Sequence, residues 1–145
     1  MECIKKEEET MPYIQTNDSV QLYYRDWGTG APVLFVSAWA FSGAMWEYQM
    51  LYLSNHGLRC IAFDRRGHGR SDDPGRGYDD IDRLSDDLAE VITRLDLRDL
   101  TLVGNSMGCG EIVHYLARHG TSRIARVVLV SGTTPGMLRS AENPQ

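Results

Sequence analysis

The regular alternation of short apolar segments with helical patterns is the feature that most limits the possible folds of this chain. Short, largely apolar runs predict buried β-strands at residues 33–36, 58–63, 100–103 and 127–130. Such runs are typical of interior strands of a parallel sheet, which are buried on both faces. Helical patterns separate the strands, at residues 44–55, 82–95 and 106–119. The order predicts an α/β fold, with a mostly parallel sheet and helices on both faces.

The segments before the first apolar run predict a hairpin and a leader. Residues 12–16 and 20–27 have the composition of two strands, and Asn17-Asp18 between them is a turn signal. Residues 1–10 are polar and predict a disordered leader, with folded sequence from residue 11 onwards. We find no repeat and no second domain, so residues 11–145 are expected to form part of one domain.

Two further segments carry local predictions. In the helix at 44–55, Met45, Tyr48, Leu51 and Tyr52 recur at helical spacing. Residues 37–43 and 64–80 are expected to be loops, and residues 131–145, which contain two prolines, are expected to be loosely structured.

Composition and charge exclude several classes of function. Apolar residues make up 42% and charged residues 24% of the 145, which is typical of a globular protein. The net charge of −5 argues against nucleic-acid binding, and no apolar run reaches membrane-spanning length. The three cysteines are widely spaced and lack CxxC pairing, which favours reduced thiols. The same spacing argues against a disulfide framework and against a metal site. The first residues lack a secretory signal, so a cytoplasmic location is expected.

The motif GNSMG, residues 104–108, lies where a predicted strand meets a predicted helix. G-x-S-x-G in that context is typical of a nucleophilic serine on a sharp, strained turn. Gly104 and Gly108 are expected where strand and helix pass too closely for side chains, and Gly110 is expected to aid the same approach. The free N–H groups of the new helix favour negative charge beside Ser106, where an oxyanion would develop. Ser106 is therefore the candidate nucleophile.

Four segments together resemble α/β-hydrolases of the non-haem haloperoxidase and aryl-esterase branch, in that family's order and spacing. They are residues 11–30, 33–54, 61–72 and 100–120. The resemblance implies an α/β-hydrolase fold truncated after about the sixth strand, and a serine hydrolase acting on small carboxylic esters. It also implies perhydrolysis in some members, which make peracids from carboxylic acids and peroxide without metal, haem or another cofactor.

The resemblance implies two backbone donors for the oxyanion. One is the N–H of Met107, and the other matches Trp39 in the loop after the third strand. The branch usually has His-Gly before the aromatic residue, whereas this chain has Ser37-Ala38. A left-handed backbone at Ala38 would be strained. Two interpretations of Trp39 stay open, an oxyanion donor and a core aromatic residue.

The sequence contains no evident acid or base for Ser106. In this fold both follow the serine along the chain, but the only later candidates are Glu111, Glu142, His114 and His119. His114 would lie about 12 Å along the helix axis from Ser106, beyond hydrogen-bond reach. The two histidines are expected on the surface of the helix. In the family, further strands, cap helices and a histidine loop would follow.

Other functional hypotheses remain. The loop at 65–71 contains His68 between glycines, but we expect a structural turn held by Arg and Asp side chains. A nucleotide-binding fold is disfavoured because no G-x-G-x-x-G follows residues 33–36. The chain could also be an inactive fragment or pseudoenzyme that acts as an interaction partner. Its strand at 127–130 would then be an apolar edge, suited to self-association or to pairing with a C-terminal fragment.

Overall fold

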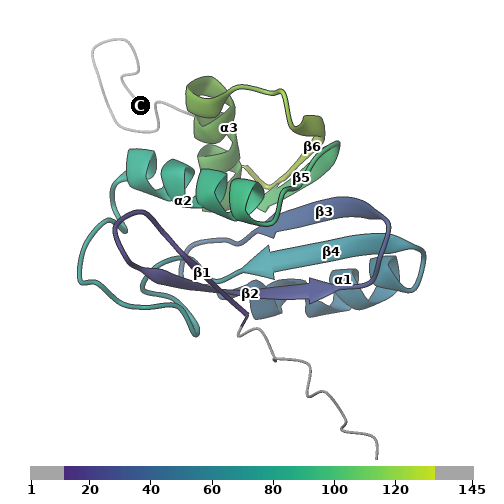
Figure 1. Ribbon diagram of the computed structural model, residues 1–145, viewed down its shortest axis with the longest axis horizontal. Helices are drawn as coiled ribbons and strands as arrows, with labels where there is room; N and C mark the ends of the chain where they lie inside the picture. The colour runs from purple at the N-terminus through teal and green to yellow at the C-terminus, as the bar shows by residue number, and fades with distance from the viewer. Residues whose placement is uncertain (1–11, 133–145) are drawn as a thin grey trace, which may run out of the picture.

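The computed structural model describes residues 12–132, which form a six-stranded sheet with helices on both faces (Figure 1). The predicted strands and helices are all present, with bounds within three residues of those expected. The elements are β1 (Tyr13–Gln15), β2 (Gln21–Trp27), β3 (Ala31–Val36), the 3₁₀ turn η1 (Gly43–Trp46), α1 (Glu47–Ser54), β4 (Leu58–Phe63), α2 (Ile81–Arg94), β5 (Leu100–Asn105), α3 (Met107–His119) and β6 (Ile124–Val130). The expected leader, residues 1–10, and residues 133–145 of the expected loose tail lie outside the described residues.

The strand order is β1-β2-β4-β3-β5-β6, and the sheet is parallel from β4 to β6. β1 and β2 form the predicted antiparallel hairpin, and β2 pairs antiparallel with β4. The helices α2 and α3 cover one face, and α1 lies on the other (Figure 1). This is the predicted α/β architecture, and it brings the carboxyl ends of β3, β4 and β5 to one edge of the sheet.

The core has two layers, one on each face of the sheet. Alternate strand residues such as Leu34, Ile61 and Leu102 pack with α2 and α3, and their neighbours Phe35 and Ala62 belong to the α1 side. The larger layer lies under α2, whose apolar residues recur at helical spacing and whose Asp80 caps its first turn.

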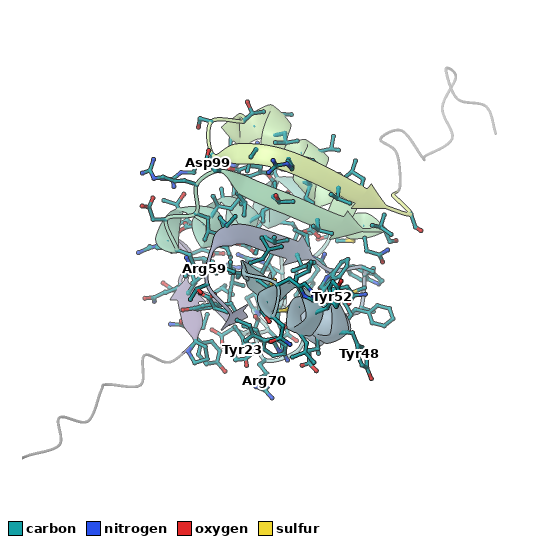
Figure 2. The ribbon with its side chains drawn as sticks, turned by 90° about the vertical axis from the view of Figure 1, so that its right-hand side faces the viewer. Tyr23, Tyr48, Tyr52, Arg59, Arg70 and Asp99 are labelled. Carbon is teal, nitrogen blue, oxygen red and sulfur yellow. The ribbon has the colours of Figure 1, made fainter. Side chains whose placement is uncertain are left out.

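Helix α1 buries a different set of residues from the one that its sequence suggested. Trp46 and Met50 pack against the sheet, and the Trp46 and Phe35 rings lie 5.0 Å apart. Tyr48, Leu51 and Tyr52 of the predicted stripe are exposed, Tyr48 by 87%. Figure 2 shows Tyr48 and Tyr52 on the outer side of α1. Trp46, Met50 and the partly buried Leu53 recur at i, i+4 and i+7, so the buried stripe has the helical period that we assumed but lies on a neighbouring face.

Helix α3 approaches β3 at Gly108 and β5 at Gly104 too closely for a side chain. A Cβ on Gly108 would lie 2.4 Å from the carbonyl oxygen of Val36, and one on Gly104 would lie 3.0 Å from the backbone nitrogen of Cys109. Both glycines therefore lie at close contacts with the backbone. Gly110 does not, because a Cβ there would meet nothing within 4 Å.

Two charged clusters hold the long loop between β4 and α2, as expected for a structural turn. The buried Arg66 guanidinium donates to Asp87 on α2 at 2.6 and 2.8 Å, and to Asp18 in the β1–β2 turn at 3.0 and 3.1 Å. The Asp64 carboxylate accepts from the N–H groups of Gly43 and Arg70. The hydrogen bond from Arg66 is the main reason that the pKa of Asp18 lies well below its usual range.

The Gly108→Ala variant should lower the free energy of unfolding by about 1–3 kcal/mol, because the new methyl group must displace backbone carbonyls of the sheet. Gly110→Ala is the matched control. It lies in open space on the same helix and should be neutral or stabilising by up to about 1 kcal/mol. Urea denaturation measures both, and equal effects of the two substitutions would contradict the close-contact interpretation.

The Asp18→Asn variant should lower the free energy of unfolding at pH 7 by about 1 kcal/mol, since the side chain is 26% exposed and solvent screens part of its attraction to Arg66. Because the pKa of Asp18 is lower in the folded state, its carboxylate stabilises the fold at pH values above its unfolded-state pKa. That contribution to the free energy of unfolding disappears as the pH falls. The difference from wild type should therefore shrink below about pH 4. Denaturation from pH 7 to pH 2 tests this, with Asp79→Asn as an exposed control; a constant difference would contradict it.

Candidate active site

Ser106 lies at the turn between β5 and α3 in a strained backbone conformation. Its φ is 51° and its ψ is −117°, a region that residues with a side chain rarely adopt. The Ser106 N–H donates to the carbonyl of Val130 at 3.1 Å, so β6 helps to hold this conformation. The Ser106 side chain makes no capping hydrogen bond to α3. Ser106 thus lies at the carboxyl end of β5, and its hydroxyl is not engaged in capping the helix.

The loop after β3 lies beside the first turn of α3. The carbonyl oxygens of Val36 and Ser37 are the atoms that a side chain at Gly108 would meet. The loop residues Ser37 to Trp39 therefore start next to the segment that carries Ser106. This arrangement brings together the two segments that the sequence analysis assigned to an oxyanion hole.

Trp39 is not a core residue, because it is 52% exposed. Its ring lies edge-on to that of His68, with centroids 5.3 Å apart. Within residues 12–132 the Trp39 N–H donates to no protein acceptor. Met107 is the first residue of α3, where backbone N–H groups lack intrahelical partners. Both donors proposed from the sequence thus belong to segments that adjoin Ser106.

The condition for strain at Ala38 is not met. Ala38 is buried and does not have a positive φ, whereas Ala40 has a φ of 62°. The left-handed residue of the loop is therefore Ala40. A glycine is not needed at position 38 for backbone conformation.

A buried ion pair beside this loop was missed by sequence reasoning. Arg65 Nε donates to Glu111 Oε1 at 2.6 Å, and the same guanidinium reaches the carbonyls of Ser37 at 2.8 Å and Ala38 at 3.4 Å. Arg65 is 3% exposed and Glu111 is fully buried. Burial raises the pKa of Glu111, and the adjacent Arg65 opposes that rise.

A signal for this pair was present in the sequence. Gly108, Glu111, Ile112 and Tyr115 recur at i, i+3, i+4 and i+7, which is the spacing of a buried helix face. A glutamate within such a face requires a buried cationic partner. We considered Glu111 only as a distant candidate acid.

The histidines of α3 face α2, away from a role with Ser106. His114 pairs with Asp82, and His119 Nε2 lies 2.8 Å from Asp86. Their side chains are about one-third exposed, in agreement with the predicted surface location. His68 Nδ1 lies 3.0 Å from the Arg66 carbonyl. Among residues 12–132, no histidine hydrogen bonds to Ser106.

The described residues hold no metal-binding cluster. No group of three or more His, Cys, Asp or Glu side chains in that part of the chain could hold a metal ion. Cys60 and Cys109 are free and buried, and burial raises the pKa of both thiols. No described helix has the length and apolar character needed to cross a membrane.

Comparisons with known proteins agree with this geometry. Residues 31–145 match the family model described as alpha/beta hydrolase fold. The chain is 47% identical to non-heme chloroperoxidase CPO-A1 of Kitasatospora aureofaciens, covering 92% of this chain and 48% of that protein. It is 40% identical to the bifunctional esterase/perhydrolase DCH of Acinetobacter calcoaceticus, covering 92% and 49%.

A solved structure shows the same arrangement of elements. The esterase EaEST from Exiguobacterium antarcticum superposes with a TM-score of 0.87 at 37% identity, over 92% of this chain and 49% of that one. The chain therefore spans about half the length of the relatives that it matches. It belongs to the alpha/beta hydrolase family, in the branch of the non-haem haloperoxidases and their esterase relatives, and corresponds to the N-terminal half of that fold.

Proposed function

We propose that Ser106 is the nucleophile of a serine hydrolase that acts on small carboxylic esters. The observation that carries this proposal is the strained Ser106 at the β5–α3 turn, with no hydrogen bond from its side chain to the helix end. Relatives named as an esterase and as an esterase/perhydrolase support the choice of reaction. Among the described residues, Cys60 and Cys109 are buried free thiols, which favours the cytoplasm as the proposed compartment.

In the proposed reaction, the Ser106 Oγ attacks the ester carbonyl carbon and a histidine takes its proton. The oxyanion accepts hydrogen bonds from the N–H groups of Met107 and Trp39 and lies near the positive end of the α3 dipole. The alcohol leaves with the proton, and water then releases the acid from Ser106. Hydrogen peroxide in place of water would release a peracid, which needs no cofactor.

The proposal requires an acid and a histidine from elsewhere. His114 and His119 of α3 pair instead with Asp82 and Asp86 of α2, which supports this requirement. We infer that both belong to a segment equivalent to the second half of the relatives, on the same polypeptide or on another. Without that segment the chain would be an inactive fragment, which is the alternative function.

Strand β6 is the proposed docking surface for that segment. It is the last strand in the sheet order, and Val127, Val128, Leu129 and Val130 are 38–48% exposed. Val128 pairs in register with Val103 and lies on the α1 side of the sheet. Figure 2 shows no described helix in front of β5 and β6 on this side. An apolar edge strand of this kind favours pairing with another strand.

Purified chain should hydrolyse p-nitrophenyl acetate at a rate close to that of its Ser106→Ala variant, because no base is positioned. Binding and oxyanion stabilisation alone can still give about 10³–10⁴-fold over water, so the variant is the necessary reference. Co-expression with the C-terminal half of the Kitasatospora relative should produce Ser106-dependent turnover and fluorophosphonate labelling at Ser106. Labelling at Ser71 or Ser131 would refute the assignment.

The chain should associate through β6, either with itself or with the complementing half. Sedimentation at several concentrations should show self-association that Val128→Lys weakens, because a charge at the edge opposes strand pairing. Val113→Lys, at a valine 38% exposed on α3, is the matched control and should leave association unchanged. A monomer at all concentrations, both alone and with the complementing half, would contradict the docking proposal.

A further inference from the structure

Arg65 joins three segments that meet at the candidate site. It follows β4, and its guanidinium reaches the carboxylate of Glu111 on α3 and the carbonyls of Ser37 and Ala38 in the loop after β3. Glu111 is five residues beyond Ser106 on the helix that begins at the nucleophile. The ion pair therefore links the loop after β3, which carries Trp39, to helix α3, which carries Met107.

The energetics suggest a role beyond stability. Removing two charges from water costs several kcal/mol each, so a buried ion pair is often no more stabilising than apolar residues of similar size. Here the pair is also incompletely satisfied, because Glu111 Oε2 has no hydrogen-bond partner among the described residues. The neighbouring Arg66 forms a second buried pair with Asp87, and the hydrogen bonds of its guanidinium go to Asp87 and Asp18 rather than to the loop after β3.

The covalent geometry of the peptide explains what Arg65 controls. The Ala38 carbonyl and the Trp39 N–H belong to one peptide unit, which is trans. In a trans peptide these two groups point in opposite directions. A hydrogen bond that fixes the Ala38 carbonyl toward Arg65 therefore turns the Trp39 N–H away from Arg65. The bond to the Ser37 carbonyl fixes the preceding peptide in the same way.

We propose that Arg65 and Glu111 are positioning residues that fix the Ala38–Trp39 peptide relative to the helix that starts at Ser106. Through this pair the N–H groups of Trp39 and Met107, the two proposed oxyanion donors, are both held relative to α3. The two donors come from separate segments of the chain. This inference rests on the proposed function for its catalytic meaning, but the effect on the loop can be measured without any turnover. Neither residue touches the reacting atoms.

The first experiment measures amide hydrogen exchange by NMR on the full 145-residue chain. The Arg65→Met/Glu111→Met variant should keep its fold, because apolar side chains of similar volume replace the pair. The amide of Phe41, whose N–H donates to the Ala38 carbonyl at 3.3 Å, should exchange at least about 10-fold faster than in wild type, with no change in β3. The Arg66→Met/Asp87→Met variant removes an equally buried pair and should leave the loop amides unchanged.

Two results would overturn the proposal. One is unchanged exchange at the Phe41 amide in Arg65→Met/Glu111→Met, and the other is an equal increase in Arg66→Met/Asp87→Met. If the first variant does not fold, Glu111→Gln serves instead. It keeps an acceptor at Oε1 but loses the charge, and it should raise loop exchange by a smaller factor while the melt stays cooperative; unchanged loop exchange in it would equally overturn the proposal.

The second experiment compares the chain and its variants after complementation with the C-terminal half of a relative. Loss of a well-placed oxyanion donor lowers kcat by about 10²–10³-fold. Arg65→Met/Glu111→Met should lower kcat by about 10- to 100-fold with KM little changed, since the donors act mainly in the transition state. Arg66→Met/Asp87→Met should leave both constants near wild type. A KM effect without a kcat effect would overturn the catalytic part. Absence of wild-type turnover would count against the proposed function, while the exchange experiment would still decide the role of the pair in the loop.

Discussion

The contact between the first turn of α3 and the end of β3 is the constraint on which the candidate site depends. At Gly108 the helix approaches the carbonyls of Val36 and Ser37 so closely that no side chain fits. This approach forces a sharp reversal after β5, and Ser106 occupies that reversal with a positive φ. The same approach places the loop after β3 beside Ser106. One steric contact is thus linked both to the strained backbone of Ser106 and to the position of the loop beside it.

Polar contacts from two directions, strand β6 and Arg65, hold this arrangement. The Val130 carbonyl accepts from the Ser106 N–H and from the Asn105 side chain, which ties the turn to β6. Arg65 ties the loop to α3 through Glu111. Backbone strain of the kind seen at Ser106 costs about 1–3 kcal/mol and persists only where surrounding structure enforces it. The dense bonding around the turn therefore accounts for its geometry.

The site also depends on the most exposed strand of the sheet. β6 supplies the Val130 carbonyl to the Ser106 turn, yet its own outer residues are 38–48% exposed. Any segment that pairs with β6 or covers it would also restrain the Ser106 turn. The chain spans about half the length of its relatives, and within residues 12–132 β6 is the last strand of the sheet. The proposed docking of a further segment on β6 would therefore act on the conformation of Ser106 as well.

The sequence by itself determined the order of the elements, the parallel sheet and the place of Ser106. Those features follow from local patterns: apolar runs, helical spacing, and glycines at a strand–helix junction. The sequence did not determine which face of α1 is buried, that Gly110 lies in open space, or that the left-handed residue of the loop is Ala40. It also did not reveal that Arg65 pairs with Glu111, 46 residues away along the chain. These outcomes depend on which segments meet in space, because burial and ion pairing at one residue are decided by the side chains that the fold packs against it.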